Sequence, residues 1–113
     1  MRKADKRMIF ESLMESIEEG ELILLDYGYC RYHKRKDNSI TIYEILVDPK
    51  VRNIGVGTRM LDMVIKKNPS SIFAKCPIDL EANKFYEAKG FVLEGQETTK
   101  SGRILNLWRL KLS

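Results

Sequence analysis

The stretch that decides the fold of this 113-residue chain is Val47-Asp48-Pro49-Lys50-Val51-Arg52-Asn53-Ile54-Gly55-Val56-Gly57-Thr58. It follows a β-rich run, Ile40–Val47, and leads into an amphipathic run, Val56–Lys67, so it joins a strand to a helix. The first turn of a helix carries unpaired amide donors and the positive end of the helix dipole. Because Gly55 and Gly57 lack a Cβ, a phosphate group can approach these amides closely.

Two side chains of the same stretch also suit an anionic ligand. Arg52 adds a fixed positive charge, and the Thr58 hydroxyl adds a donor. We therefore predict a pyrophosphate cradle made of Arg52, Asn53, Ile54, Gly55, Val56, Gly57 and Thr58. The pattern is neither a Walker loop nor a dinucleotide fingerprint, because both need different glycine spacing. Taken alone, it also fits a glycine-rich turn that only packs the helix tightly against the strand.

The rest of the chain predicts a mixed α/β fold around one central sheet, in the order α-β-β-β-α-β-α-β-β. The predicted helices are Lys6–Glu19, Val56–Lys67 and Asp79–Lys89, and the predicted strands are Glu21–Tyr27, Tyr29–Arg35, Ile40–Val47, Ser71–Cys76, Phe91–Glu97 and Ile104–Leu112. Asp79 is the expected N-cap of the last helix, and Gly90 is its expected C′ residue. Residues 36–39 are predicted to be the turn of a hairpin, Gly28 is expected to permit a turn or bend, and the last two strands to form a closing antiparallel hairpin.

Composition limits the class of protein. Apolar residues make up 43% of the chain and charged residues 32%, which is typical of a soluble globular protein. We find no repeat or linker and predict one domain, residues 1–113. No apolar run approaches the ~18 residues of a membrane span, and the charged amino terminus does not resemble a signal peptide, so we expect a cytoplasmic protein without membrane contact.

The remaining residues capable of special chemistry have ordinary interpretations. Cys30 and Cys76 form no C-x-x-C pair and have only His33 as a further soft ligand, so we expect two reduced core thiols and no metal. The net charge of +4 is too small to indicate nucleic-acid binding by itself. We interpret the basic run Arg31–Lys36 as the solvated face and tip of a hairpin, and Trp108 as a core residue.

A second segment extends the interpretation of the glycine loop. It is Cys76-Pro77-Ile78-Asp79-Leu80-Glu81-Ala82-Asn83-Lys84-Phe85-Tyr86-Glu87-Ala88-Lys89-Gly90-Phe91. With the Arg-x-x-Gly-x-Gly loop before it, the chain resembles the GNAT family of N-acetyltransferases, which pairs such a loop with a later Asn…Phe-Tyr-Glu-x-x-Gly-Phe helix. The resemblance covers about Ile40 to Leu112. It implies a mostly antiparallel central sheet flanked by helices.

The resemblance also implies acetyl-coenzyme A as co-substrate, direct transfer to a primary amine in a ternary complex, and a role for each matching residue. Leu46 and Val47 match the strand whose backbone pairs with the pantetheine arm, and Arg52 through Thr58 match the pyrophosphate loop. Asn83 matches a helix residue that hydrogen-bonds the arm, and Tyr86 matches the tyrosine beside the thioester sulfur. A phenol there can act as general acid to the departing thiolate.

The general base is less clear from sequence. Glu44 lies just before Val47, close to where the acetyl group is expected. A glutamate in an apolar strand faces either the cleft or a solvated sheet surface, because its burial is costly. We therefore hold Glu44 either as catalytic or substrate-orienting, or as a solvent-facing strand residue.

The chain departs from the family pattern at its beginning. Only about twenty residues precede the first predicted strand, where the family has a strand and one or two helices that wall the acceptor site. Half of that wall is then either missing or supplied by a second subunit, as in a homodimer. The amine acceptor is not specified by the sequence. Two alternatives stay open: a non-catalytic coenzyme A-binding module of the same fold and, less favoured, a small basic nucleic-acid-binding protein.

Overall fold

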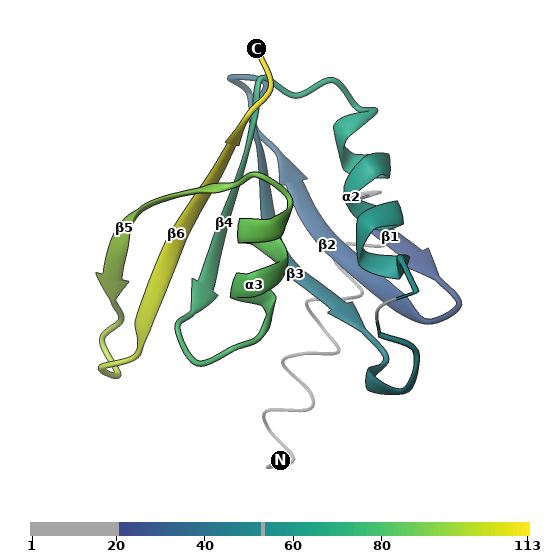
Figure 1. Ribbon diagram of the computed structural model, residues 1–113. Helices are drawn as coiled ribbons and strands as arrows, with labels where there is room; N and C mark the ends of the chain where they lie inside the picture. Colours follow the sequence, from purple (N-terminus) through teal and green to yellow (C-terminus); the bar gives the residue numbers. More distant parts are fainter. Residues whose placement is uncertain (1–20, 53) are drawn as a thin grey trace.

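The computed structural model describes residues 21–52 and 54–113 (Figure 1). Its elements are, in order, β1 (Leu22–Leu25), β2 (Gly28–Lys34), β3 (Ile40–Val47), the 3₁₀ turn η1 (Pro49–Val51), α2 (Val56–Ile65), β4 (Ser71–Pro77), α3 (Ala82–Ala88), β5 (Val92–Thr98) and β6 (Ile104–Lys111). The predicted mixed α/β fold is confirmed, with the strands and the last two helices in the predicted order. The predicted helix Lys6–Glu19 lies outside the described residues.

The six strands form one sheet in the order β1-β2-β3-β4-β6-β5. Neighbouring strands are antiparallel except β3 and β4, which are parallel and pair only from Ile40–Ile72 to Ile42–Ala74. Beyond that point the two strands diverge, so the sheet opens into two arms like a V (Figure 1). α2 packs on the arm formed by β1, β2 and β3, and α3 packs on β4.

A β-bulge explains where the arms separate. Arg31 of β2 faces Glu44 of β3, but the next residue, Tyr32, faces Ile42, so Tyr43 is an extra residue on β3. A bulge bends the strand that carries it and increases its twist. Because the pairing of β3 with β4 ends at Ile42, beside the bulge, we infer that the bulge turns the second half of β3 away from β4.

The core lies between the sheet and the two helices α2 and α3. The helix α2 is amphipathic, as predicted, and buries Met60, Leu61 and Val64. They join a cluster that also contains Ile23, Cys30, Tyr32, Ile40, Ile42, Ile72, Ala74, Cys76, Tyr86, Phe91 and Trp108. The predictions of a buried Trp108 and of two free buried thiols are confirmed.

One predicted helix start was wrong. α3 begins after Glu81, which is its N-cap, and not after Asp79. The backbone N–H of Leu80 donates to the Pro77 carbonyl at 3.1 Å, and the Asn83 side chain donates to the carbonyls of both residues at 2.8 Å. These bonds hold residues 77–80 as a turn, so the helix cannot begin within them.

Gly28 was predicted to permit a turn or bend, but the structure places it in a strand. It is the first residue of β2, opposite Val47, and its φ is not positive. A Cβ at this position would lie 2.6 Å from the Leu46 carbonyl oxygen. Glycine is therefore required because β2 and β3 approach closely here.

Candidate functional site

The first turn of α2 has the features that an anion site needs. Its N-cap is Gly55, whose φ of 90° lies in the left-handed region that favours glycine. No side chain in the described part of the chain caps this helix, and a Cβ on Gly55 would meet no atom within 4 Å. The amides of the first turn therefore lie at the positive end of the helix dipole without a side-chain cap among the described residues.

Gly57 brings the two sequence motifs together. A Cβ at Gly57 would lie 3.1 Å from Cε1 of Phe85, so the Phe85 ring of α3 packs directly on the first turn of α2. Of the other predicted loop residues, Ile54 is exposed, while Val56 and Thr58 are partly buried. Asn53 lies outside the described residues. The predicted loop and helix thus meet at the open end of the sheet, where β3 and β4 have diverged beyond Ile42 and Ala74. We call this region the mouth of the V.

Arg52 has a protein partner. Its Nη1 lies 3.3 Å from Oε2 of Glu81, the N-cap residue of α3. Because both side chains are largely exposed, this ion pair contributes at most about 1 kcal/mol. The pair connects the loop after β3 to the loop after β4. In this structure the Arg52 guanidinium, which the sequence assigned to a phosphate ligand, is therefore bound by Glu81.

Leu46 and Val47 lie on the half of β3 that has left β4. One edge of this half pairs with β2, through Tyr29–Leu46 and Gly28–Val47. The other edge pairs with no strand in residues 21–52 and 54–113. An unpaired edge presents backbone donors and acceptors to which an extended ligand can add like a further strand.

Tyr86 is fixed by the end of α3. The N–H of Phe91 donates to the Tyr86 carbonyl and that of Gly90 to the Glu87 carbonyl, which is a Schellman motif with Gly90 at φ 91°. The predicted C′ role of Gly90 is thereby confirmed. The Phe91 ring packs edge-on against Tyr86 at 5.0 Å between centroids, and Trp108 lies on another side at 6.5 Å. The Gly-Phe of the motif therefore orients the tyrosine.

The environment of the Tyr86 hydroxyl favours its protonated form. The side chain is only 3% exposed, and this burial raises its pKa. Cys76 on β4 and Cys30 on β2 are near enough to raise the pKa of Tyr86 further. Tyr86 thus lies between the two arms, with its hydroxyl able to donate a proton at neutral pH.

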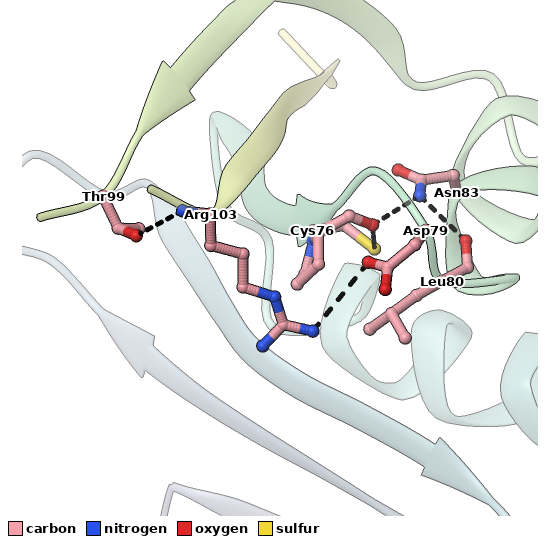
Figure 2. A network of polar contacts seen from close by, with 7 residues as sticks. Cys76, Asp79, Leu80, Asn83, Thr99 and Arg103 are labelled. Atoms are coloured by element: carbon pink, nitrogen blue, oxygen red, sulfur yellow. Dashed lines mark hydrogen bonds and ion pairs between the residues drawn. The ribbon is translucent and has the colours of Figure 1, made fainter. Parts of the chain in front are cut away.

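Asn83 forms a structural network (Figure 2). Its amide nitrogen donates to the carbonyls of Pro77 and Leu80, and Figure 2 shows the amide turned back onto this loop. Its oxygen accepts from Asn106 Nδ2 at 3.0 Å and from Trp108 Nε1 at 2.9 Å. These four bonds use both donors and both lone pairs of the amide. The predicted contact of Asn83 with a cofactor arm would replace one of them, and it stays a prediction.

Glu44 belongs to a polar cluster on the splayed arm. Its Oε1 accepts a hydrogen bond of 2.6 Å from the Tyr29 hydroxyl and lies 3.8 Å from Nε of Arg31. Partial burial and the bond to Glu44 raise the pKa of Tyr29 to about 12, so this hydroxyl remains a donor. The Glu44 side chain is 42% exposed. Glu44 is therefore held in place by its neighbours while it still reaches solvent.

Three basic side chains of the run Arg31–Lys36 contact other residues of the protein. His33 Nδ1 lies 2.8 Å from Glu21 Oε1, and Arg35 Nε donates to Thr41 Oγ1 at 2.7 Å. The Arg31 guanidinium stands over the Tyr43 ring at 5.4 Å. Glu21, just before β1, and Thr41 and Tyr43 of β3 are thus the partners of these residues. Residues 34–36 are exposed, as predicted for the tip of a hairpin.

The sequence did not indicate Arg31 and Glu81 as site residues, nor a pocket of about 430 Å³ beside α2. This pocket is lined by Leu24, Leu25, Asp26, Tyr27, Ile54, Gly55, Val56 and Arg59. It lies where the β1–β2 turn meets the first turn of α2, two segments far apart in sequence. For Arg31, a count of hairpin pairs outward from residues 37–38 would have placed it near Glu44.

Two other kinds of site have no support in the described residues. Residues 21–52 and 54–113 contain no group of three or more His, Cys, Asp or Glu side chains that could hold a metal ion. Nor does this part of the chain contain a helix with the length and hydropathy needed to cross a bilayer.

Comparisons with known proteins agree with this geometry. The acetyltransferase (GNAT) domain family matches residues 14–93, which is more than half of the chain. No curated protein sequence matches. A Bacillus anthracis protein assigned as a streptothricin acetyltransferase, solved with acetyl coenzyme A, is 28% identical with a TM-score of 0.68, over 80% of this chain and 60% of its own. The chain thus spans less than two thirds of that protein.

Two further structures resemble the chain over more of their length. A Desulfovibrio desulfuricans protein assigned to the GNAT acetyltransferases is 19% identical with a TM-score of 0.77, covering 100% of this chain and 84% of its own. A GNAT-family acetyltransferase from Bacillus cereus is 21% identical with a TM-score of 0.76, covering 91% and 78%. At these identities the likeness concerns the fold alone.

Proposed function

The chain belongs to the GNAT family of acetyltransferases, and we propose that it transfers an acetyl group from acetyl-coenzyme A to a primary amine. The observation that carries the proposal is the packing of the Phe85 ring of α3 on Gly57 in the first turn of α2, which joins the glycine loop to the helix that carries Tyr86. It is supported by the left-handed Gly55 at the start of α2 and by the edge of β3 that pairs with no strand among the described residues. The solved Bacillus anthracis relative, which contains acetyl coenzyme A, supports the choice of acyl donor.

The residues at this mouth fit the two chemically different parts of the donor. The first-turn amides of α2 and Arg52 would hold the pyrophosphate, with Ile54, Gly55, Val56, Gly57 and Thr58 forming the cradle. Asn53, which lies outside the described residues, is included in the cradle from the sequence alone. The edge of β3 at Leu46 and Val47, which pairs with no strand in the described part of the chain, would pair with the amides of the pantetheine arm. Bound there, acetyl-coenzyme A supplies an activated acetyl thioester. Asn83 is proposed to contact the arm by exchanging one of its present hydrogen bonds.

Tyr86 is proposed as the general acid. When the thioester breaks, the leaving sulfur carries negative charge, and a phenol that keeps its proton can donate to it. Burial raises the pKa of Tyr86, so its hydroxyl carries a proton at neutral pH, and the same shift makes it a weaker acid than an exposed phenol. The rings of Phe91 and Trp108 pack against the Tyr86 ring and limit the positions of its hydroxyl, which favours proton transfer to a sulfur bound in one orientation.

Glu44 is proposed as the base. An amine attacks only when neutral, so an ammonium acceptor must first lose a proton. Glu44 lies on the diverging half of β3, between the bulge and Leu46, and is partly open to solvent. The Tyr29 hydrogen bond fixes its carboxylate without removing its second oxygen from use.

The proposal is tested by the release of coenzyme A thiol from acetyl-coenzyme A in the presence of amines. The panel contains amino acids, a peptide with a free amino terminus, a lysine peptide, a polyamine and an amino sugar. We expect amine-dependent thiol release with one class, and an N-acetylated product by mass spectrometry. Binding of acetyl-coenzyme A with no turnover on any class would favour the non-catalytic binding module instead.

A further inference from the structure

We propose that Arg31 and Glu44 form an acceptor subsite for an α-amino acid, in which Glu44 receives the amine and Arg31 the carboxylate. The inference rests on the proposed function and names the class of its acceptor.

Arg31 has unused binding capacity. Its Nε atom is buried and has no hydrogen-bond partner, and Oε1 of Glu44 is 3.8 Å away, beyond hydrogen-bond distance. A buried donor without an acceptor is unfavourable, and few such atoms occur in folded proteins. In residues 21–52 and 54–113 this is the only buried side-chain nitrogen or oxygen of the kind. A carboxylate bound to the accessible part of the guanidinium would supply the acceptor if it also reached Nε, which requires the side chains that cover this atom to move.

The guanidinium is also arranged for a planar anion. Its central carbon lies 5.4 Å over the Tyr43 ring, a contact that limits the positions of the group. The side chain is 23% exposed, so part of it is accessible while Nε is not. Guanidinium groups bind carboxylates through two parallel hydrogen bonds, which makes a carboxylate the best-matched ligand.

The spacing between the two charges selects the ligand. Arg31 and Glu44 face each other across β2 and β3, with 3.8 Å between Nε and Oε1. An α-amino acid carries its ammonium and carboxylate on one carbon, so both can meet an opposite charge across such a short gap. A polyamine has no group for Arg31, and binding it would place like charges together.

The position of the pair fits delivery of the amine. Glu44 lies between Ile42, where β3 leaves β4, and Leu46, on the edge proposed for the pantetheine arm. An amine held by Glu44 is therefore near the proposed place of the thioester. Tyr29 donates to the same oxygen of Glu44 and leaves its other oxygen for the ammonium group.

The test compares a pool of the twenty common amino acids with a pool of their α-carboxamides, which keep the amine and lose the negative charge. Thiol release is measured for the parent, for Arg31→Gln and for Arg109→Gln. Arg109 is a matched control because it also pairs with a glutamate, Glu94 at 2.8 Å, and stands over a ring, Phe73 at 5.3 Å, on the other arm. Acetyl-coenzyme A binding is measured for all three by thermal shift.

We expect the parent and Arg109→Gln to release thiol about 10- to 100-fold faster with the acid pool than with the amide pool, since charged hydrogen bonds are lost with the carboxylate. Arg31→Gln should lose most of this preference and still be stabilised by acetyl-coenzyme A. Equal rates of thiol release with acids and amides by the parent would overturn the inference. It would also be overturned if acetyl-coenzyme A stabilised the parent but no acid in the pool were acetylated. A parent that acetyl-coenzyme A does not stabilise contradicts the proposed function itself.

Discussion

Arg52 and Glu81 form an ion pair of 3.3 Å across the mouth of the V, although 29 residues separate them. Arg52 follows the 3₁₀ turn η1 in the loop between β3 and α2, and Glu81 is the N-cap of α3. In the proposed function, the phosphates of acetyl-coenzyme A take the place of Glu81. The carboxylate of Glu81 and the incoming phosphates therefore compete for one guanidinium.

Removing this competition should strengthen cofactor binding. We expect Glu81→Gln to lower the dissociation constant for acetyl-coenzyme A about 2- to 5-fold, since an exposed ion pair is worth up to about 1 kcal/mol. Calorimetric titration measures the change. Glu97→Gln removes another exposed pair, Lys75–Glu97 at 3.0 Å, and should leave the constant unchanged. Weaker binding by Glu81→Gln alone would indicate that Glu81 positions Arg52 for the ligand.

The left-handed conformation of Gly55 predicts a graded response to substitution. Because there is free space around the position, only the backbone conformation at φ 90° opposes a side chain. Asparagine tolerates this region and valine does not. Gly55→Val should therefore lower the free energy of unfolding by roughly 1–2 kcal/mol or more, and Gly55→Asn by clearly less, measured by urea denaturation. Equal losses would argue against a requirement for positive φ.

The general-acid role predicts a selective defect in Tyr86→Phe. The phenylalanine keeps the ring contacts with Phe91 and Trp108 and removes only the proton donor. We expect kcat to fall about 100-fold or more, while the dissociation constant for acetyl-coenzyme A and the melting temperature stay close to the parent values. A variant with normal kcat would exclude Tyr86 as the acid.

Burial of Cys30 makes the fold sensitive to alkali. The pKa of this thiol is raised from 9.0 to about 12, because the side chain is fully buried. The folded state therefore keeps the proton at pH values where the unfolded chain releases it. The resulting stability is complete below about pH 9 and is lost as pH rises toward 12, at roughly 1.4 kcal/mol per pH unit.

The readout for Cys30 is the slope of stability against pH, measured by urea unfolding from pH 8 to 11. Cys30→Ala has a lower stability throughout, because it leaves a small cavity. Above pH 9 its stability should nevertheless fall less steeply than that of the parent. Parallel slopes would show that the thiol does not ionise on unfolding in this range.

The local chemistry of the chain was enough to predict most of the fold. β3 has the predicted bounds, Ile40–Val47, and α2 starts at the predicted Val56, because alternation, the Asp48-Pro49 stop and the glycines act locally. The N-cap of α3 was wrong because it depends on Asn83, whose bonds to Pro77 and Leu80 hold the preceding turn. Such side-chain bonds to a loop are not visible as a periodic pattern.

The partners of the site residues were less predictable. Counting pairs back from the β2–β3 turn brings Arg31 near Glu44, but the bulge that aligns them depends on packing across the sheet. The approach of Arg52 to Glu81 depends on how the two arms diverge. Motifs therefore indicated the residue types at the mouth of the V, while their pairing required the three-dimensional arrangement.

The central claim is that the mouth of the V binds acetyl-coenzyme A through the first turn of α2. The most direct measurement is a calorimetric titration of the parent and Arg52→Glu with acetyl-coenzyme A and with S-acetylpantetheine, which lacks the pyrophosphate. We predict one bound acetyl-coenzyme A per chain, binding at least about 10-fold weaker in Arg52→Glu, and much weaker binding of S-acetylpantetheine to both. No binding of acetyl-coenzyme A by the parent, or equal affinities for the two ligands, would contradict the account.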